Sequence, residues 1–227
     1  MDNRRLSIII PALNEENTLH ACIASALRLD PMEVIVVDGG SSDRTRQVAL
    51  DAGAVVISSP RGRGIQMNRG ASQAGGDILL FLHADSFLSA DNSGILFQTV
   101  DNGYAGGFFR LQFDDRSLST RLVCVFANAR SRLFSLPYGD QAVFIKRDIF
   151  KRIGGFRDYP FLEDIDIVLR VKKHGRLKYL SPSVTASARR IRKPFPLSPI
   201  LLSIRNMLLV ILFLSGVRPD RLAGFYR

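Results

Sequence analysis

The chain has 227 residues, 46% of them hydrophobic, which is enough for one sizeable core or for one core with a small appendage. Its two cysteines, Cys22 and Cys124, are far apart and fit no metal-ligand spacing, so we expect buried thiols in a reducing compartment. The hydrophobic run before Pro11 is too short for a signal peptide, which favours a cytoplasmic protein. The formal net charge of +10 favours anionic partners.

The first 85 residues predict strands that alternate with helices. Buried strands are expected at residues 6–11, 33–38, 54–59 and 77–85. Helices are expected at residues 16–27, from about residue 43, and up to about residue 74. This order is typical of parallel βαβ units, so we expect an α/β fold with a mostly parallel central sheet flanked by helices. The loops after the strands should then share one crevice, where such sheets bind ligands.

After residue 100 the pattern is more mixed. A helix is expected at 117–133, followed by a short strand and a helix within YGDQAVFIKRDIF and a last short strand at LKYLSP. Between them, FLEDIDIVLRVKKHG predicts an amphipathic helix, because Ile165, Val168 and Leu169 fall at helical spacing and Gly175 suits a C-cap. We assign residues 1–190 to the α/β domain and residues 191–227 to a basic, apolar, helical tail.

Residues 198–217 are strongly apolar, but Arg205 and Asn206 interrupt them, whereas a spanning helix needs about 20 apolar residues. A helix that lies in the membrane interface, or packs on the domain or on a second subunit, is therefore favoured over a membrane span. From Arg189 onward, eight basic residues face one acid, Asp220. Long aliphatic runs separate them, so lipid or a phosphorylated substrate is a better partner than nucleic acid. We expect a cytoplasmic protein, or one peripheral on the cytoplasmic face of the membrane.

Acidic residues follow the first two predicted strands. In PALNEE, Glu15 and Glu16 could simply open a helix at its positive dipole end. Asp38 could bind a ribose or a base, as acids do in nucleotide-binding βα loops, or could merely precede the turn GGSS. Asp43 is expected to be a helix N-cap or a first-turn acid.

A glycine-rich loop, RGRGIQMN, follows the third predicted strand. It is not a dinucleotide fingerprint, because Met67 stands where G-x-G-x-x-G needs its third glycine and because the loop does not follow the first strand. Its backbone, together with Arg61 and Arg63, would still suit a diphosphate. A solvated loop is the alternative.

Asp85 closes the predicted strand at 77–85. A desolvated carboxylate is costly unless it is paired or bound to a metal. Mg²⁺ and Mn²⁺ prefer carboxylate oxygens and leave open positions for substrate phosphates. We therefore expect Asp85 to bind a divalent cation that bridges to a nucleotide diphosphate, with a turn or cap role as the alternative.

A second acidic cluster, made of Glu163, Asp164 and Asp166, opens the predicted amphipathic helix. All three could be structural, because carboxylates are favourable at a helix N-terminus. One of them could instead be a general base that activates an acceptor hydroxyl.

The motifs PALNEE, VVDGGSSDRT, the loop reaching Asn68, FLHADS, IGGF and LEDIDIVLR, in this order, resemble the family 2 glycosyltransferases over about residues 6–190. The elements RGRxxQMN, HADS, YGDQA, SARR and RPDRLAxxYR look closest to a small bacterial subgroup associated with arsenosugar biosynthesis. The resemblance implies a GT-A (Rossmann-like) fold. It also implies an inverting transfer of a sugar from a nucleotide-diphosphate sugar to a hydroxyl acceptor, with Mn²⁺ or Mg²⁺ as cofactor.

The resemblance also implies roles for the matching residues. Asp164 matches the catalytic base, with Glu163 beside it, and Asp85 matches the metal ligand at the end of the D-x-D motif. Near the donor sugar or the acceptor it places Gly139, Asp140 and Gln141, and against the diphosphate it places Arg189 and Arg190. The nucleotide is expected to contact Pro11, Asn14, Glu15, Asp38, Gly39, Arg63, Gln66, Asn68, His83 and Ala84.

One residue departs from the family pattern: His83 replaces the first acid of D-x-D. That acid commonly faces the ribose, so we expect His83 to do so through a neutral nitrogen, leaving Asp85 as the single carboxylate at the metal. For the acceptor, the tail favours a lipid-linked molecule and a membrane contact, or equally a homodimer seam. A sugar nucleotidyltransferase would need a glycine-rich loop directly after the first strand, which PALNEE is not. The remaining alternative is a non-catalytic nucleotide-sugar sensor or membrane-attached scaffold, which His83 favours and the intact LEDID and YGDQ oppose.

Overall fold

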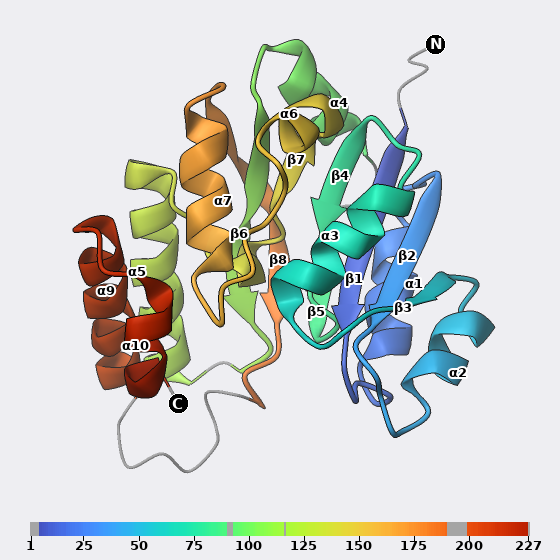
Figure 1. Ribbon diagram of the computed structural model, residues 1–227, viewed down its shortest axis with the longest axis horizontal. Helices are drawn as coiled ribbons and strands as arrows, with labels where there is room; N and C mark the ends of the chain where they lie inside the picture. The colour runs from blue at the N-terminus through green and yellow to red at the C-terminus, as the bar shows by residue number, and fades with distance from the viewer. Residues whose placement is uncertain (1–4, 90–92, 116, 190–198, 227) are drawn as a thin grey trace.

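The computed structural model describes residues 5–89, 93–115, 117–189 and 199–226, and it shows one curled sheet with helices on both faces (Figure 1). The strands are β1 (Leu6–Ala12), β2 (Glu33–Asp38), β3 (Val55–Ser58), β4 (Ile78–Phe81), β5 (Ser86–Leu88), β6 (Gly106–Phe113), β7 (Phe144–Lys146) and β8 (Leu177–Ala186). The helices are α1 (Leu19–Leu27), α2 (Thr45–Asp51), α3 (Arg63–Gln73), α4 (Gly94–Asp101), α5 (Leu118–Phe134), the 3₁₀ turn η1 (Gly139–Gln141), α6 (Arg147–Arg152), α7 (Glu163–Lys172), α9 (Pro199–Leu214) and α10 (Pro219–Tyr226).

The first half of the sheet confirms the expected βαβ units. Strand β1 pairs in parallel with β2 and β4, and β2 pairs in parallel with β3. The sheet as a whole is mixed, because its order is β3-β2-β1-β4-β7-β6-β8-β5 and β7 runs antiparallel to both β4 and β6. The expectation of a mostly parallel sheet is therefore corrected beyond β4. A short apolar run looks the same in either direction, so the connections between strands decide how each one runs.

Two element boundaries near the crevice also differ from the expectation. The strand predicted at 77–85 ends at Phe81, so His83 and Asp85 lie in the turn that leads to β5. The strand predicted at LKYLSP is the longer β8, which pairs in parallel with β6 along its length and antiparallel with β5 near its end. These partners come from distant parts of the sequence and extend the strand beyond its local apolar run.

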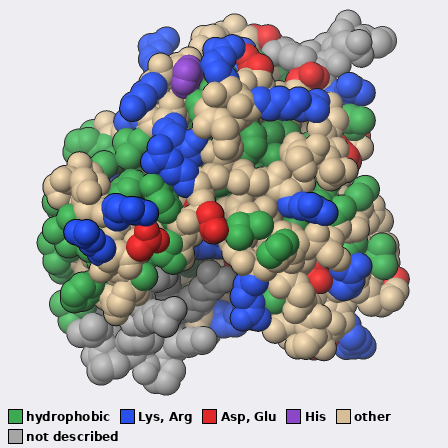
Figure 2. Space-filling model, in the orientation of Figure 1, with side chains coloured by type: hydrophobic (Ala, Val, Ile, Leu, Met, Phe, Trp, Pro, Cys, Tyr) green, Lys and Arg blue, Asp and Glu red, His purple; other side chains and the backbone are tan. Residues whose placement is uncertain are grey.

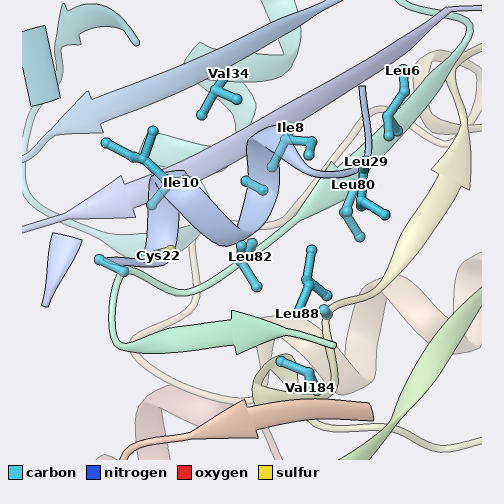
Figure 3. Packing of buried hydrophobic residues seen from close by; sticks show 14 of the residues in the cluster. Leu6, Ile8, Ile10, Cys22, Leu29, Val34, Leu80, Leu82, Leu88 and Val184 are labelled. Carbon is cyan, nitrogen blue, oxygen red and sulfur yellow. The ribbon is translucent and has the colours of Figure 1, made fainter. Parts of the chain in front are cut away.

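Two apolar layers enclose the sheet. Leu6, Ile8 and Ile10 point from β1 into the layer that contains Cys22 of α1 (Figure 3). Ile9 points into the opposite layer, which α3, α6 and α7 cover. A strand that is buried on both faces reads as a continuous apolar run, as β1 does. This packing fixes the carboxyl ends of the central strands, from which the loops of the site extend.

The C-terminal helices pack on the same chain. Helix α9 lies along α5, and the two are side by side at one edge of the molecule, next to α10 (Figure 1). Leu209 of α9 and Leu222 of α10 form a small cluster with Phe161, which precedes α7. None of the helices in the described part of the chain has the length and hydrophobicity needed to cross a membrane.

Candidate active site

A cavity of about 790 Å³ contains the side chains that the sequence suggested for the reacting centre. Its polar part is lined by Arg63, His83, Asp85, Asp140 and Asp164. These residues come from the start of α3, the turn between β4 and β5, η1 and the start of α7. The fold therefore brings together residues that are up to about a hundred positions apart in the sequence. The remainder of the wall comes mainly from α5 and α9.

The turn that carries Asp85 is held from both sides. The backbone N–H of Ser187 donates a 3.0 Å hydrogen bond to the carbonyl of Asp85. The thiol of Cys22 donates a 3.3 Å hydrogen bond to the carbonyl of His83. Burial raises the pKa of this thiol, so Cys22 acts as a neutral donor that supports the turn. Asp85 itself is only 6% exposed.

Asp164 lies in the first turn of α7 and is held by a glycine. The backbone N–H of Gly139 donates a 3.1 Å hydrogen bond to Oδ2 of Asp164. A Cβ atom at position 139 would collide with the Asp164 carboxylate, so the approach requires glycine. The YGDQ motif thus positions the carboxylate that the family resemblance marks as the base.

Glu163, next to Asp164, has a different role. It is 1% exposed, and its Oε1 forms a 2.8 Å ion pair with Nε of Arg63. This contact holds the arginine of the glycine-rich loop against the start of α7, where Arg63 also lines the cavity. A buried carboxylate that is paired with an arginine is suited to orienting that arginine.

The acids of the site have raised pKa values. Burial, together with the neighbouring charge of Asp164, raises the pKa of Glu163 to about 7, and Arg63 opposes the shift. Burial also raises the pKa of Asp164, against the effect of Arg63 and of the Gly139 hydrogen bond. Burial raises the pKa of Asp140 to about 6, with Arg130 opposing it and Asp164 and Asp85 adding to it. Clustered acids with raised pKa values are typical of sites for proton transfer.

Asp140 and Gln141 are neighbours with opposite orientations. Asp140 lines the cavity, and its buried Oδ1 accepts no hydrogen bond from the described residues. Gln141 is fully buried outside the cavity wall, where its Nε2 donates a 3.1 Å hydrogen bond to the carbonyl of Phe109 and its Oε1 accepts one from Ser131. The structure therefore places Asp140 in the site and Gln141 in the support beneath it.

The residues expected at the nucleoside lie in two linked loops, after β1 and after β2. Oδ1 of Asn14, a residue with a φ of 53°, accepts a 2.9 Å hydrogen bond from the N–H of Ser42. The N–H of Glu15 donates a 2.8 Å hydrogen bond to Oγ1 of Thr45. Asp38 is 2% exposed, and its Oδ1 accepts a 3.1 Å hydrogen bond from the N–H of Ser41. The two loops are thus held together as one surface.

The two amides of the glycine-rich loop are engaged with backbone. Nε2 of Gln66 donates to the carbonyls of Ala12 and Val37 at 3.0 and 2.8 Å, and its side chain packs over Gly39. Asn68 makes two 2.8 Å hydrogen bonds with the backbone of Phe156 in the IGGF motif. Both side chains join α3 to other parts of the site. Pro11 and Ala84 are buried in β1 and in the β4–β5 turn.

Arg189 connects the two halves of the site. Its guanidinium donates to both carboxylate oxygens of Glu15, at 3.0 and 2.8 Å. The contact with Glu15 raises the pKa of Arg189, and the charge of Asp85 adds to this effect. Arg189 is therefore close to both the nucleoside loops and the candidate metal ligand. Arg190 lies outside the described residues.

The donor set fits a cation that is shared with a substrate. Among the described residues, no three His, Cys, Asp or Glu side chains are grouped so that they could hold a metal ion by themselves. Asp85 is a buried carboxylate that faces the cavity. Mg²⁺ and similar ions are commonly bound by one or two carboxylates together with substrate phosphates and water. Asp85 fits this second kind of site.

Sequence reasoning missed the second wall of the cavity. Arg130 and Tyr138 line it, and the Arg130 guanidinium lies 3.6 Å from the centre of the Tyr138 ring. Phe126 of α5 and Met207 of α9 line it as well. The available signal was the number of apolar residues in α5 beyond those that one buried face needs. Their pairing with α9 could not be read from either helix alone.

Comparison with known proteins shows the family of the chain. The model of the family described as glycosyl transferase family 2 matches residues 7–157. The chain belongs to glycosyl transferase family 2.

Two curated relatives are similar over most of the chain. The PGL/p-HBAD biosynthesis glycosyltransferase of Mycobacterium tuberculosis is 33% identical over 192 residues, which cover 72% of this chain and 68% of that protein. The probable glycosyltransferase YdaM of Bacillus subtilis is 24% identical over 211 residues, which cover 80% of this chain and 50% of that protein. The chain thus spans about half the length of the second relative.

Two solved structures share the fold. The mannosyltransferase PcManGT from Pyrobaculum calidifontis, in complex with GDP-Man and Mn²⁺, has a TM-score of 0.66 at 17% identity and covers 96% of this chain and 67% of that one. Glucosyl-3-phosphoglycerate synthase from M. tuberculosis, in complex with Mn²⁺ and UDP-glucose, has a TM-score of 0.62 at 20% identity. The match covers 95% of this chain and 80% of that one. The similarity confirms the expected GT-A-like fold.

Proposed function

We propose that the protein is an inverting glycosyltransferase that moves a sugar from a nucleotide-diphosphate sugar to a hydroxyl acceptor. The observation that carries the proposal is the convergence of Asp85, Asp164 and Arg63 on one cavity. A candidate metal ligand, a candidate base and a phosphate-binding cation are the groups that such a transfer needs. Family membership supports the same reaction class.

The donor is proposed to bind across the two linked loops. The nucleoside would contact Asn14, Glu15 and Asp38, and its ribose would contact His83. The diphosphate would contact Arg63 and Arg189. Two solved relatives contain Mn²⁺ with either UDP-glucose or GDP-mannose, so uridine and guanosine donors are the first to test. Asp85, together with substrate phosphate oxygens, would hold a divalent cation, which would supply positive charge at the departing diphosphate.

Asp164 is proposed as the general base. It takes the proton of the acceptor hydroxyl while the acceptor oxygen forms a bond to the anomeric carbon. The bond from that carbon to the phosphate oxygen breaks, and its electron pair leaves with the nucleoside diphosphate. Asp164 lines the cavity, whereas Glu163 is engaged with Arg63, which favours Asp164 over Glu163 as the base. Arg63 and Arg189 stabilise the charge that develops on the leaving group.

The finer assignments also belong to this proposal. Placement in the arsenosugar-associated subgroup rests on the motifs RGRxxQMN, HADS, YGDQA and SARR. The division into a domain (residues 1–190) and a tail (residues 191–227) also stays a proposal. So does peripheral contact of the tail with the cytoplasmic face of a membrane.

The test is release of nucleoside diphosphate from UDP- and GDP-sugars by the purified chain. Asp164→Asn should lower turnover by at least about a hundredfold, the usual scale for a lost general base, while donor binding stays within a few fold. Asp148→Asn, on the exposed side of α6, is the matched control and should leave both unchanged. Donor binding without turnover in the wild-type chain would instead support the sensor or scaffold alternative.

A further inference from the structure

The catalytic cavity continues into an apolar channel between α5 and α9. Beyond Asp164 and Asp140, its wall consists mainly of apolar side chains of these two helices. From α5 come Val123, Phe126, Ala127, Leu133 and Phe134, and from α9 come Ile204, Met207 and Leu209. A nucleotide-sugar donor is polar and charged along its whole length, so this part of the cavity does not suit it.

The channel is also open at the surface. Phe126 and Leu133 of α5 are 63% and 75% exposed, and Met207 of α9 is 50% exposed. Hydrophobic side chains gather at the same edge of the molecule, over the C-terminal helices, with basic and acidic side chains among them (Figure 2). Apolar groups that line a cavity and remain exposed indicate a site for an apolar ligand.

We infer that the acceptor is an alcohol with an aliphatic chain, which lies between α5 and α9 while its hydroxyl meets Asp164. This inference rests on the proposed function. The cavity favours an acceptor of this kind because one continuous space joins Asp164 to the apolar walls. An acceptor that fills it must be polar at one end and apolar along the rest.

The position of the charged groups agrees with an amphipathic acceptor. Arg130 lies close enough to Asp140 to lower the pKa of that carboxyl, so it sits near the reacting end. Arg205 of α9 also lines the cavity, next to Asn206. These polar groups can meet the head of the acceptor, and the helix faces between them can meet its chain. A second copy of the protein on this face would block the path of an acceptor to Asp164, which makes a homodimer seam the less suitable occupant.

The first experiment uses butyl, hexyl and octyl β-D-glucosides, which keep the hydroxyl-bearing head constant while the chain grows. Binding is measured by isothermal titration calorimetry below the critical micelle concentration of each. Burial of a methylene strengthens binding by roughly threefold to fourfold, so octyl glucoside should bind at least about twentyfold more tightly than butyl glucoside. Equal affinity for the three glucosides would overturn the inference.

Matched variants test the place of binding. Phe126→Glu and Met207→Glu put a charge on the wall of the channel and should remove the dependence on chain length. Val125→Glu and Leu208→Glu change exposed neighbours that do not line the cavity, with exposures of 63% and 53%, and should keep that dependence. All four residues are exposed, so their folding is checked simply by circular dichroism. Equal loss in all four variants would indicate general surface adsorption, and loss in none would indicate another site; either result overturns the channel.

Two further readouts separate this inference from the proposed function. Nucleoside diphosphate release with methyl glucoside equal to that with octyl glucoside would support the transfer reaction and overturn the apolar acceptor. Chain-length-dependent binding without turnover of any donor would keep the apolar site and contradict the transferase. Light scattering tests whether a second copy of the protein occupies the channel instead. If the wild-type protein is a dimer that Phe126→Glu dissociates, and no glucoside binds, the channel is a dimer interface and the inference is overturned.

Discussion

The backbone N–H of Gly139 and the Oδ2 atom of Asp164 are 3.1 Å apart and hydrogen-bonded, which joins the YGDQ and LEDID motifs directly. The contact stabilises the ionised form of a half-buried carboxylate without adding a charged partner. Asp164 also lines the cavity, where its carboxylate can face an acceptor. The two motifs therefore work as one unit.

Gly139→Ala should lower sugar transfer by at least about tenfold, because the added methyl group would collide with the Asp164 carboxylate and displace it by a sizeable fraction of an ångström. Donor binding should change little, since the hydrogen bonds that link the loops after β1 and β2 do not involve Gly139. Initial rates and titration of the nucleoside diphosphate measure the two effects. Gly224→Ala, where a Cβ atom has open space, is the control. Unchanged transfer in Gly139→Ala would show that the position of Asp164 is not critical.

The rate of transfer should fall as the pH decreases through about 7, because Glu163, whose pKa is raised to about 7, then takes up a proton and Arg63 loses its carboxylate partner. A general base must be deprotonated, and burial raises the pKa values of both Glu163 and Asp164. The two acids are coupled, so the acidic limb of the pH profile belongs to the pair. Glu163→Gln should move this limb to lower pH, because only the titration of Asp164, whose pKa burial raises, then remains. It should also lower the maximal rate, because Arg63 loses its partner. A limb that stays at the same pH in this variant would contradict the assignment.

Asp140→Asn should stabilise the protein at pH 7.5. The pKa of Asp140 is raised to about 6, so between about pH 4 and 6 the folded state holds a proton that the unfolded state has lost. The unfolding free energy therefore decreases as the pH rises through this window. The variant should gain on the order of 1–2 kcal/mol at pH 7.5, or a few degrees in Tm, and nothing near pH 4.

Thermal melts of Asp140→Asn and the wild-type protein at pH 4, 5, 6 and 7.5 check this. A difference in Tm that is the same at every pH would mean that the carboxylate is not the cause. The same variant should transfer sugar more slowly if Asp140 meets the donor sugar or the acceptor, which would be a trade of stability for function.

EDTA should remove most of the stabilisation that a nucleoside diphosphate confers on the wild-type protein. Ligands that bind only the native state raise Tm by mass action, and the fit of Asp85 to a substrate-shared cation makes that binding depend on metal. Thermal shifts with UDP and GDP, each with Mn²⁺, Mg²⁺ or EDTA, measure the effect. In Asp85→Asn the three conditions should give the same small shift. A large shift in EDTA with the wild-type protein would show that the diphosphate is held by arginines alone.

The sequence by itself determined the alternation of strands and helices up to β4 and the identity of the chemical groups. A buried parallel strand such as β1 is apolar throughout, and acids such as Asp38 and Asp85 after buried strands are hard to explain by packing. Local patterns of this kind survive because each depends on a few neighbouring residues.

The tertiary structure decided the rest. The direction of β7, the length of β8 and the pairing of α5 with α9 all depend on contacts between residues far apart in the chain. The same holds for the different roles of Glu163 and Asp164. These adjacent acids of LEDID have different partners, because Glu163 pairs with Arg63 and Asp164 accepts a hydrogen bond from Gly139. Long-range contacts leave no periodic trace in a single sequence, so only folding reveals which carboxylate faces the cavity.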